Sequence, residues 1–356
     1  MKKSLIALAV MAAAGAASAQ SSVTLFGIVD AAITHGSASD GGQSWTGMTS
    51  SGYNSSRLGF RGTEDLGGGM SASFWLEGQI DNDDGSGRAA GGGFDFARRS
   101  TVSLAGGWGE VRLGRDYTPS FWNLTVFDPF GTNGVGSNQM LAGAGLIGAN
   151  VVRASNSIGY FLPPNLGGFY GQVNYWFGEN DATGNEDLGD GYGLRLGYGA
   201  GPFNVALSFA RTDLSTDAPV VTDGDYSTWN LGGSWDFGMA KVMAQYQRDN
   251  VDTGVGDFDG RGWLLGALVP VGAGEIRASY SEYRTDPILV GGEDTRGRKL
   301  ALGYVHNLSK RTALYATIAR VSNDGGAAYT LGGATANPLA GDFNSTGYDI
   351  GIRHSF

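Results

Sequence analysis

The sequence predicts an all-β protein, a 16-stranded antiparallel β-barrel that crosses a membrane. Three observations support this fold class. The last ten residues, 347–356, alternate apolar and polar side chains up to the terminal Phe356, residues 1–19 are organised like an export signal, and a two-residue alternation runs through the rest of the chain. Together these features place the protein in the outer membrane of a Gram-negative bacterium.

The N-terminal segment supplies the export signal. Two lysines at positions 2 and 3 precede an apolar run at 5–17, and Ala17-Ser18-Ala19 forms a small-residue cleavage site. The alternative, a membrane anchor, requires about 20 apolar residues, more than this run contains. We therefore expect residues 1–19 to be a signal peptide and residues 20–356 to form a single barrel domain.

The composition favours a large sheet and excludes several functions. The chain has 62 glycines together with 15 Tyr, 17 Phe and 8 Trp, and little helical patterning. It has no cysteine, which excludes disulfides, thiolate metal sites and thiol nucleophiles. The formal net charge of −10 argues against nucleic acid as a partner, because phosphate binding needs a basic surface. We expect no cofactor and no metal site.

The alternation divides the chain into segments of the length that tilted membrane strands require. The clearest example is residues 169–177, where Phe169, Val173 and Phe177 share one face and polar residues occupy part of the other. The sixteen expected strands lie near 22–34, 55–64, 70–81, 95–105, 108–116, 153–161, 168–178, 191–200, 202–212, 226–236, 239–249, 260–269, 273–284, 296–306, 312–322 and 346–356.

Connection lengths distinguish a membrane barrel from a soluble sandwich. Short links, such as 106–107 and 271–272, alternate with long polar ones, as expected for periplasmic turns and extracellular loops. An open sheet in hydrocarbon would leave edge N–H and C=O groups unpaired, at several kcal/mol each, so the first and last strands must pair. Sixteen strands enclose more space than side chains fill, and the lumen should therefore contain water.

Short stretches in order along the mature chain carry a family resemblance. They are 23–30 (VTLFGIVD), 56–69 (SRLGFRGTEDLGGG), 113–115 (LGR), 156–160 (NSIGY), 308–312 (LSKRT), 314–315 (LY) and the terminal Phe356. With these stretches the sequence resembles the general diffusion porins of Gram-negative bacteria, of the beta-proteobacterial type. The resemblance implies passive diffusion of small hydrophilic solutes and ions through a homotrimer of sixteen-stranded barrels.

The resemblance also implies that the third long loop, 117–150, is folded into the lumen as a constriction. The loop's composition independently fits this location, because Phe121, Trp122, Phe127 and Met140 are among many apolar residues unusual in a solvated loop. The family often has Pro-Glu-Phe-Gly-Gly at the loop tip, whereas this chain has Asp-Pro-Phe-Gly at 128–131.

Charged residues on the polar face of the strands are the candidate pore residues. If Leu58 and Phe60 face lipid, their neighbours face water, and the resemblance places a ladder of arginines opposite the third loop. Guanidinium groups remain charged at any relevant pH and attract anions in pores. We assign the pore constriction to Arg57, Arg61, Arg98, Arg112, Arg115 and Arg153, with Glu77, Glu110 and Asp128 as the acidic residues.

These assignments favour weak anion preference, although simpler interpretations stay open. The arginines could be ordinary solvated or paired barrel residues. The acidic residues are concentrated in the expected external loops. There they could form a solvated vestibule, or they could bind hard cations that bridge to the phosphates of lipopolysaccharide. Outer-membrane lipids and lipopolysaccharide are therefore the expected membrane partners.

An enzymatic role finds little support in the sequence. His35, His306 and His354 are isolated and no nucleophile motif accompanies them, so no catalytic residue is assigned. Two alternatives to a general diffusion channel remain, namely a substrate-selective outer-membrane channel and, less favoured, an outer-membrane barrel enzyme.

Overall fold

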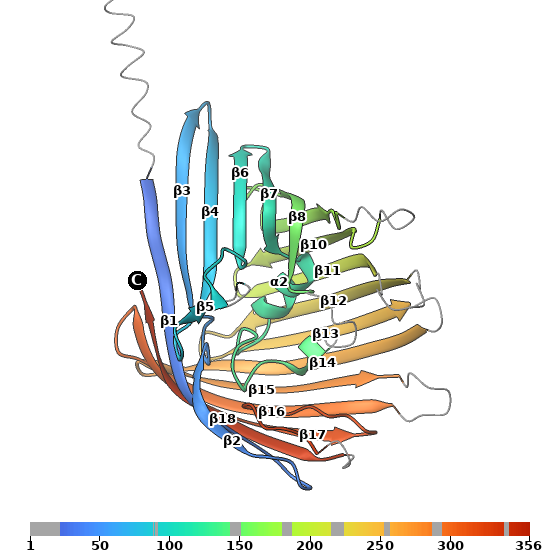
Figure 1. Ribbon diagram of the computed structural model, residues 1–356. Helices are drawn as coiled ribbons and strands as arrows, with labels where there is room; N and C mark the ends of the chain where they lie inside the picture. Colours follow the sequence, from blue (N-terminus) through green and yellow to red (C-terminus); the bar gives the residue numbers. More distant parts are fainter. Residues whose placement is uncertain are drawn as a thin grey trace, which may run out of the picture.

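Sixteen long antiparallel strands form the wall of a closed barrel in the computed structural model of the chain (Figure 1). The structure describes residues 22–87, 89, 92–142, 151–179, 187–214, 224–252, 257–286, 294–337 and 342–356. The expected signal peptide, residues 1–19, lies outside the described residues, as do residues 143–150 of the third long loop.

Each of the sixteen expected segments overlaps one wall strand, so the predicted fold class is confirmed. The wall strands are β1 (Ser22–Ala38), β3 (Arg57–Gly67), β4 (Met70–Asp81), β6 (Arg99–Gly106), β7 (Gly109–Tyr117), β8 (Arg153–Phe161), β9 (Phe169–Trp176), β10 (Gly191–Ala200), β11 (Phe203–Leu214), β12 (Gly224–Asp236), β13 (Lys241–Asp252), β14 (Asp257–Val271), β15 (Gly274–Thr285), β16 (Thr295–Asn307), β17 (Thr312–Asp324) and β18 (Asn344–Ser355).

Two further short strands lie within connections that the sequence reading treated as loops. β2 (Trp45–Ser50) pairs with residues 31–36 of β1, beyond the point where the pairing of β1 with β3 ends. β5 (Ser86–Gly87) pairs with the end of β4, beyond its pairing with β6. Both short strands therefore continue the pairing of a neighbouring wall strand, and neither adds a further strand to the circumference of the barrel.

The barrel closes between its first and last long strands. β1 pairs with β18 from Ile28↔Ser355 to Ala38↔Ser345, and its other edge pairs with β3. The backbone of Phe356 continues this seam, because its N–H donates to Gly27 O and its carbonyl accepts from Gly27 N–H. Closure removes the free strand edges that hydrocarbon would penalise.

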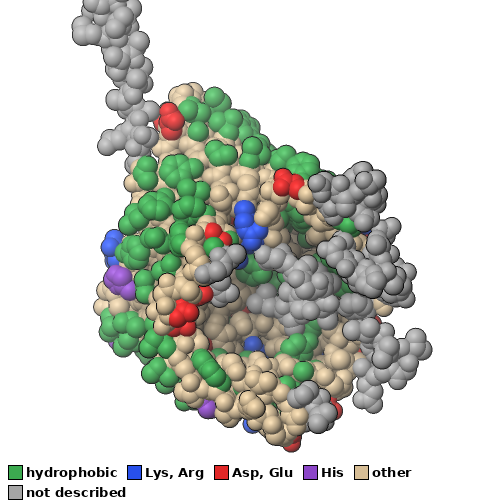
Figure 2. Space-filling view, in the orientation of Figure 1, with side chains coloured by type: hydrophobic (Ala, Val, Ile, Leu, Met, Phe, Trp, Pro, Cys, Tyr) green, Lys and Arg blue, Asp and Glu red, His purple; other side chains and the backbone are tan. Residues whose placement is uncertain are grey.

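Apolar side chains cover the outside of the wall. On β16, Leu300 and Leu302 are 61% and 53% exposed, whereas the alternate residues Lys299 and Ala301 are buried. The same two-residue period is clear in strands such as β10 and β13, and Figure 2 shows hydrophobic side chains gathered on the outer surface around a hollow that contains Lys and Arg side chains. Polar residues therefore face the interior of the barrel, which is the inverse of a soluble protein.

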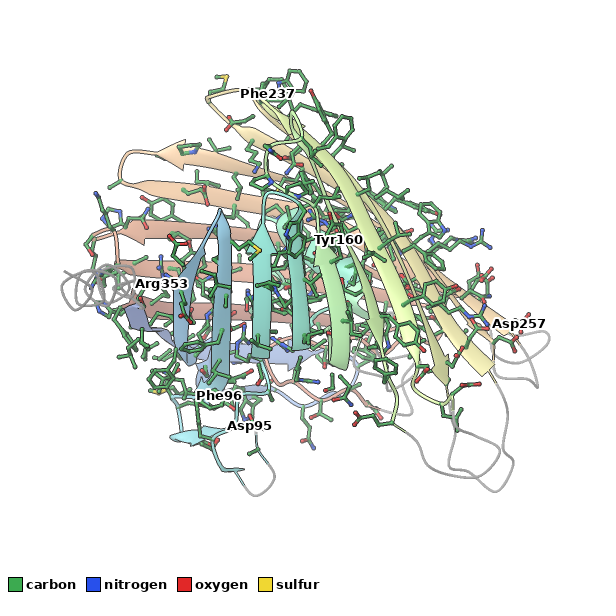
Figure 3. The ribbon with its side chains drawn as sticks, turned by 90° about the horizontal axis from the view of Figure 1, so that it is seen from above. Asp95, Phe96, Tyr160, Phe237, Asp257 and Arg353 are labelled. Atoms are coloured by element: carbon green, nitrogen blue, oxygen red, sulfur yellow. The ribbon has the colours of Figure 1, made fainter. Side chains whose placement is uncertain are left out.

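The two ends of the barrel differ in the length of their connections. At one end, here called the turn end, Gly67, Gly68 and Gly69 have φ of 78°, 63° and 79°, a left-handed region that side chains disfavour. These three glycines therefore allow the tight turn between β3 and β4. The loop end bears the long connections, and Figure 3 shows Phe237 at the turn end and Asp257 at the opposite end of the same part of the wall.

The third long connection contains two short helical elements. α2 (Pro119–Val126) begins after Thr118, whose side chain accepts a hydrogen bond from the Phe121 N–H, and it has proline at its first position. The 3-10 helix η2 (Gln139–Ala142) follows. Within the described ranges, no helix has the length and apolar character needed to cross a membrane.

Candidate functional site: an arginine-lined passage

The described part of the third long connection, 118–142, is hydrogen-bonded to the inward face of the wall. The side-chain amide of Asn123 in α2 donates to Ala206 O at 2.9 Å and to Asn230 Oδ1 at 2.7 Å. Asn230 in turn donates to Ser120 O at 3.1 Å, and Gln245 donates to Leu124 O at 2.9 Å. All these wall residues lie on the face opposite the exposed apolar one.

Beyond α2 the segment contacts strands farther round the wall. Phe127 is fully buried against Gly232 of β12, where an added Cβ would lie 2.2 Å from its ring. The carboxylate of Asp349 in β18 accepts a hydrogen bond from Val135 N–H at 2.8 Å, and Lys299 donates to Ser137 O at 2.8 Å. The segment 118–142 therefore follows the inner wall from β11 to β18.

Asp128 organises this segment from within. Its carboxylate accepts hydrogen bonds from the backbone N–H groups of Phe130, Thr132 and Asn138, at 2.9, 3.0 and 3.1 Å. Burial raises the pKa of the Asp128 carboxyl above its ordinary value, against the opposite effect of these hydrogen bonds. We expected Asp128 to face the arginines, and the structure corrects this position, because the side chain is turned into its own loop.

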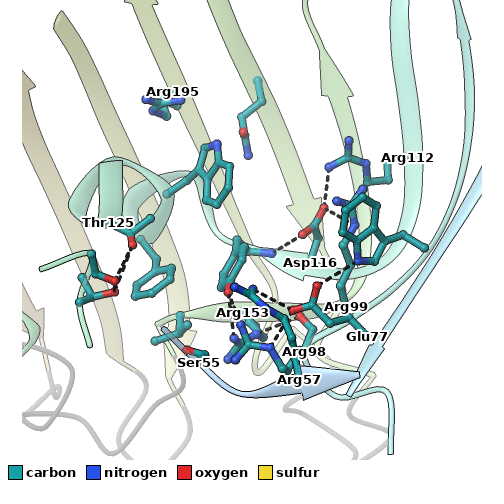
Figure 4. A pocket seen from close by; sticks show the side chains of 18 of the residues that line it. Ser55, Arg57, Glu77, Arg98, Arg99, Arg112, Asp116, Thr125, Arg153 and Arg195 are labelled. Atoms are coloured by element: carbon teal, nitrogen blue, oxygen red, sulfur yellow. Dashed lines mark hydrogen bonds and ion pairs between the residues drawn. The ribbon is translucent and has the colours of Figure 1, made fainter. Parts of the chain in front are cut away.

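A cavity with a volume of ≈ 860 Å³ lies between the segment 118–142 and the strands β3 to β10 (Figure 4). Its lining includes six arginines and two carboxylates, contributed by Arg57, Arg98, Arg99, Arg112, Arg153, Arg195, Glu77 and Asp116. The segment contributes Phe121, Trp122 and Thr125 to the other side. Positive charge thus exceeds negative charge along this passage, in a chain that is acidic as a whole.

Glu77 of β4 lies between two of the arginines. Its Oε1 accepts from Arg98 Nε at 2.7 Å and lies 3.3 Å from Arg57 Nη1, while Oε2 accepts from the Trp75 indole at 3.1 Å. One carboxylate therefore orients two guanidinium groups, and this cluster keeps an excess of positive charge. The fixed geometry prevents the long side chains from collapsing into the passage.

Asp116 of β7 orients a second pair. Its Oδ2 accepts from Arg112 Nη1 at 2.6 Å and lies 3.6 Å from Arg99 Nε. Arg112 also donates from Nε to Glu110 Oε1 at 2.9 Å. Aromatic rings support both guanidinium groups, with Arg99 4.6 Å from the Trp75 ring.

Arg153 and Arg195 are held by uncharged partners. Arg153 lies 4.7 Å from the centre of the Tyr117 ring, and its Nε donates to Arg98 O at 2.9 Å. Arg195 lies 4.8 Å from the Tyr170 ring and donates to Asn123 Oδ1 of α2 at 2.9 Å. Among the described residues neither guanidinium forms an ion pair, so both positive charges remain uncompensated at short range.

The structure brings together five of the expected constriction residues, which are Arg57, Arg98, Arg112, Arg153 and Glu77. Glu110 contacts Arg112 without lining the cavity. Arg61 is exposed nearer the turn end, 5.1 Å from the Trp75 ring. Arg115 lines a separate cavity of ≈ 280 Å³ and donates to Ala97 O.

Sequence reasoning missed two charged lining residues. Asp116 and Arg195 line the cavity although neither was assigned to it. Strand alternation does place Arg195 on the polar face of β10, between Leu194 and Leu196, and this signal was available in the sequence. In the described part of the chain, no three His, Cys, Asp or Glu residues come together as a metal site.

A closed barrel with an apolar outside and a charged, hollow inside defines an outer-membrane channel. The outer membrane porin protein 32 of Delftia acidovorans is 44% identical over 367 residues, covering 100% of both chains. An outer membrane porin of Bordetella pertussis is 33% identical over 410 residues, again covering 100% of both. The model of the Gram-negative porin family matches residues 5–326, and the chain belongs to this family.

Solved structures agree with this assignment. The anion-selective porin from Comamonas acidovorans is 40% identical and superposes with a TM-score of 0.85, covering 95% of this chain and 100% of that chain. The trimer form of OmpT from Vibrio cholerae, at 14% identity, shares the fold with a TM-score of 0.66 and covers 94% of this chain and 99% of that chain. The protein is thus a porin of the outer membrane.

Proposed function

We propose that this porin passes small hydrophilic solutes and ions by diffusion with a preference for anions, and that the arginine-lined cavity is its constriction. The excess of arginines over carboxylates around one cavity carries this proposal. Rings of arginine attract anions and repel cations in narrow pores, where the charges act at close range. The description of the Comamonas relative as anion-selective supports the same assignment.

The segment 118–142 narrows the channel in this proposal. Its hydrogen bonds to inward-facing residues of β11, β12, β13 and β18 support a position within the lumen. The passage then runs between Trp122 and Thr125 on one side and the arginines of β3 to β7 on the other.

The assembly we propose is a homotrimer embedded among outer-membrane lipids and lipopolysaccharide, exported by cleavage after Ala19. The trimer form of OmpT, which shares the fold, is consistent with this assembly. The protein acts as a channel and has no enzymatic activity in this proposal, in keeping with its family. Cross-linking of the purified protein tests the trimer, and N-terminal sequencing tests the cleavage site.

Ion selectivity in planar bilayers provides the test of the constriction. Arg57→Gln/Arg153→Gln should move the reversal potential in a salt gradient towards cation preference, because both side chains line the cavity. Lys310→Gln/Arg311→Gln is the matched control, since it removes the same charge from the exposed turn between β16 and β17. An equal shift in both variants, or none in the first, would refute the assigned constriction.

A substrate-selective channel is the alternative outcome of the same measurement. Such a channel would show conductance that one solute blocks saturably, whereas a diffusion channel shows conductance that rises with salt concentration. A series of sugars and small organic anions of graded size, added to the wild type, distinguishes the two cases.

A further inference from the structure

Four arginines form a row across neighbouring strands near the loop end of the barrel. Arg248 of β13 pairs in register with Arg261 of β14, Arg261 with Arg284 of β15, and Arg284 with Arg296 of β16. Residues that are paired across antiparallel strands project from the same face of the sheet. The row therefore lies on one face of the wall.

That face is the outer one. Arg248 is two residues beyond Tyr246, and Arg261 is two residues before Trp263, and both aromatic residues are 39% exposed on the apolar surface. Arg298 precedes the exposed Leu300 by two residues, and Arg320 follows the exposed Ile318 by two. We call Arg248, Arg261, Arg284, Arg296, Arg298 and Arg320 the arginine band.

The arginine band borders the apolar surface at the depth of lipid headgroups. Trp229 and Tyr246 lie 5.4 Å apart by ring centres, and Trp263 and Tyr280 lie 5.2 Å apart, on the outer surface next to the band. Tyr and Trp gather at the membrane–water interface, so side chains one step farther towards the loop end reach the headgroups. The band follows this border over β13, β14, β15, β16 and β17.

Acidic neighbours compensate the band only in part. Arg248 Nη2 lies 2.7 Å from Asp259 and Arg261 Nη2 lies 3.6 Å from Asp294, yet the two arginine side chains stay 54% and 51% exposed. Arg284 pairs with Glu282 and Arg298 pairs with Asp324, whereas Arg296 and Arg320 form no ion pair among the described residues. Each of these ion pairs engages one guanidinium nitrogen, so the band keeps further donors, and like charges opposed across strands would be stabilised by an anion between them.

The band is restricted to one side of the barrel. On strands β1, β3, β4, β6 and β7, the outward positions of the described residues hold one Lys or Arg, Arg115, which donates to Ala97 O and Ser155. A general need for charge at the membrane border would place arginines around the whole circumference. The local concentration instead indicates a specific anionic neighbour.

We propose that the arginine band binds phosphate groups of lipid headgroups in the outer leaflet of the membrane. Guanidinium groups match phosphate oxygens with paired hydrogen bonds, and they suit a border where apolar chains and phosphates meet. This inference goes beyond the channel function, because the band lies on the outside of the wall and away from the passage.

Binding of diphosphoryl lipid A in detergent micelles to the purified full-length protein tests the proposal. Arg248→Gln/Arg261→Gln should weaken binding about tenfold, since each basic residue near anionic lipid contributes measurably to affinity. Lys310→Gln/Arg311→Gln, which removes equal charge at the turn end of the same barrel, should bind within about twofold of the wild type. Single-channel conductance should be unchanged in Arg248→Gln/Arg261→Gln, which also reports that the barrel is folded.

Further binding measurements distinguish the possible ligands of the arginine band. Dephosphorylated lipid A should bind more weakly than the diphosphoryl form, and millimolar inorganic phosphate should not displace the lipid. Equal affinity of the two lipids, or full displacement by inorganic phosphate, would overturn the proposal. Dissociation of the trimer in Arg248→Gln/Arg261→Gln would overturn it in favour of a contact between copies, and if that variant fails to fold, the single variants decide the same question.

Discussion

Asn123 and Asn230, 107 residues apart in the chain, are joined by an amide–amide hydrogen bond of 2.7 Å between α2 and the inner wall. Asn230 completes the contact by donating to Ser120 O at 3.1 Å. Both residues are 1% exposed, so this hydrogen bond is shielded from water. This pair therefore fixes the distance between α2 and β12.

Replacing Asn123 should loosen α2. Asn123→Ala removes the buried hydrogen bonds of this side chain to Ala206 O, Asn230 Oδ1 and Arg195 Nε, which costs about 1–3 kcal/mol of stability. We expect a lower urea midpoint and a wider spread of single-channel conductance. Asn307→Ala, at an exposed position on the turn end of β16, is the control and should change neither quantity. Identical conductance distributions in wild type and Asn123→Ala would show that α2 does not limit the current.

Contact between Phe127 and Gly232 offers a packing test. An added Cβ at Gly232 would lie 2.2 Å from the Phe127 ring, so Gly232→Ala should destabilise the protein by about 1–3 kcal/mol. At the neighbouring Gly233 the nearest atom would be 3.5 Å away, and Gly233→Ala should be tolerated. Urea unfolding of both variants measures the difference. If the two variants unfold at the same midpoint, the segment 118–142 is not packed against β12.

Salt should weaken the anion preference without abolishing it. The Debye length falls from about 10 Å at 0.1 M to about 3 Å at 1 M, which screens exposed charges more than those at a constriction. We expect the wild-type reversal potential to decrease in magnitude when both solutions are raised tenfold in concentration at a constant gradient. The selectivity of Arg57→Gln/Arg153→Gln should vary less with salt. A wild-type preference that is independent of salt would contradict an electrostatic origin.

Acidification should stabilise the third connection through Asp128. Burial raises the pKa of this carboxyl in the folded protein, so the folded state takes up a proton at a higher pH than the unfolded state does. The contribution of Asp128 to the free energy of unfolding therefore increases as pH falls through the raised pKa towards about 3.9, the ordinary value.

The difference between wild type and Asp128→Asn isolates this contribution. We expect the urea midpoint of the wild type to increase relative to that of Asp128→Asn as the pH is lowered from neutral to about pH 4. Asp83→Asn, at an exposed loop position, should show no such divergence. Parallel pH profiles for wild type and Asp128→Asn would exclude a raised pKa at this site.

The two-residue periodicity of the sequence was sufficient to predict the wall strands but not to predict every residue of the site. Alternation predicts the outward side of strands such as β16, because hydrocarbon requires Leu300 and Leu302 to share one face. It could not predict β2 and β5, which are short and whose pairing depends on where β3 and β6 stop.

Local departures from alternation explain the misplaced residues. Asp116 is not one of them, since simple alternation along β7 places it on the same face as Arg112, while Arg115 lines the separate cavity. Arg98 precedes β6, so it escapes the strand period and reaches the cavity together with Arg99. The side chain of Asp128 is held by backbone N–H groups of its own loop. The loop conformation that presents these groups cannot be predicted from residue types alone.

Pairing of β1 with β18 has a consequence for biogenesis. Ile28 is opposite Ser355, so the seam joins the first and the last wall strand, and its paired residues are more than 300 positions apart in the sequence. Such contacts form late, because bringing distant residues together is entropically costly. No partly synthesised chain can complete this ring, and the edges of β1 must be kept from other partners until the C-terminal residues have left the ribosome and crossed the inner membrane.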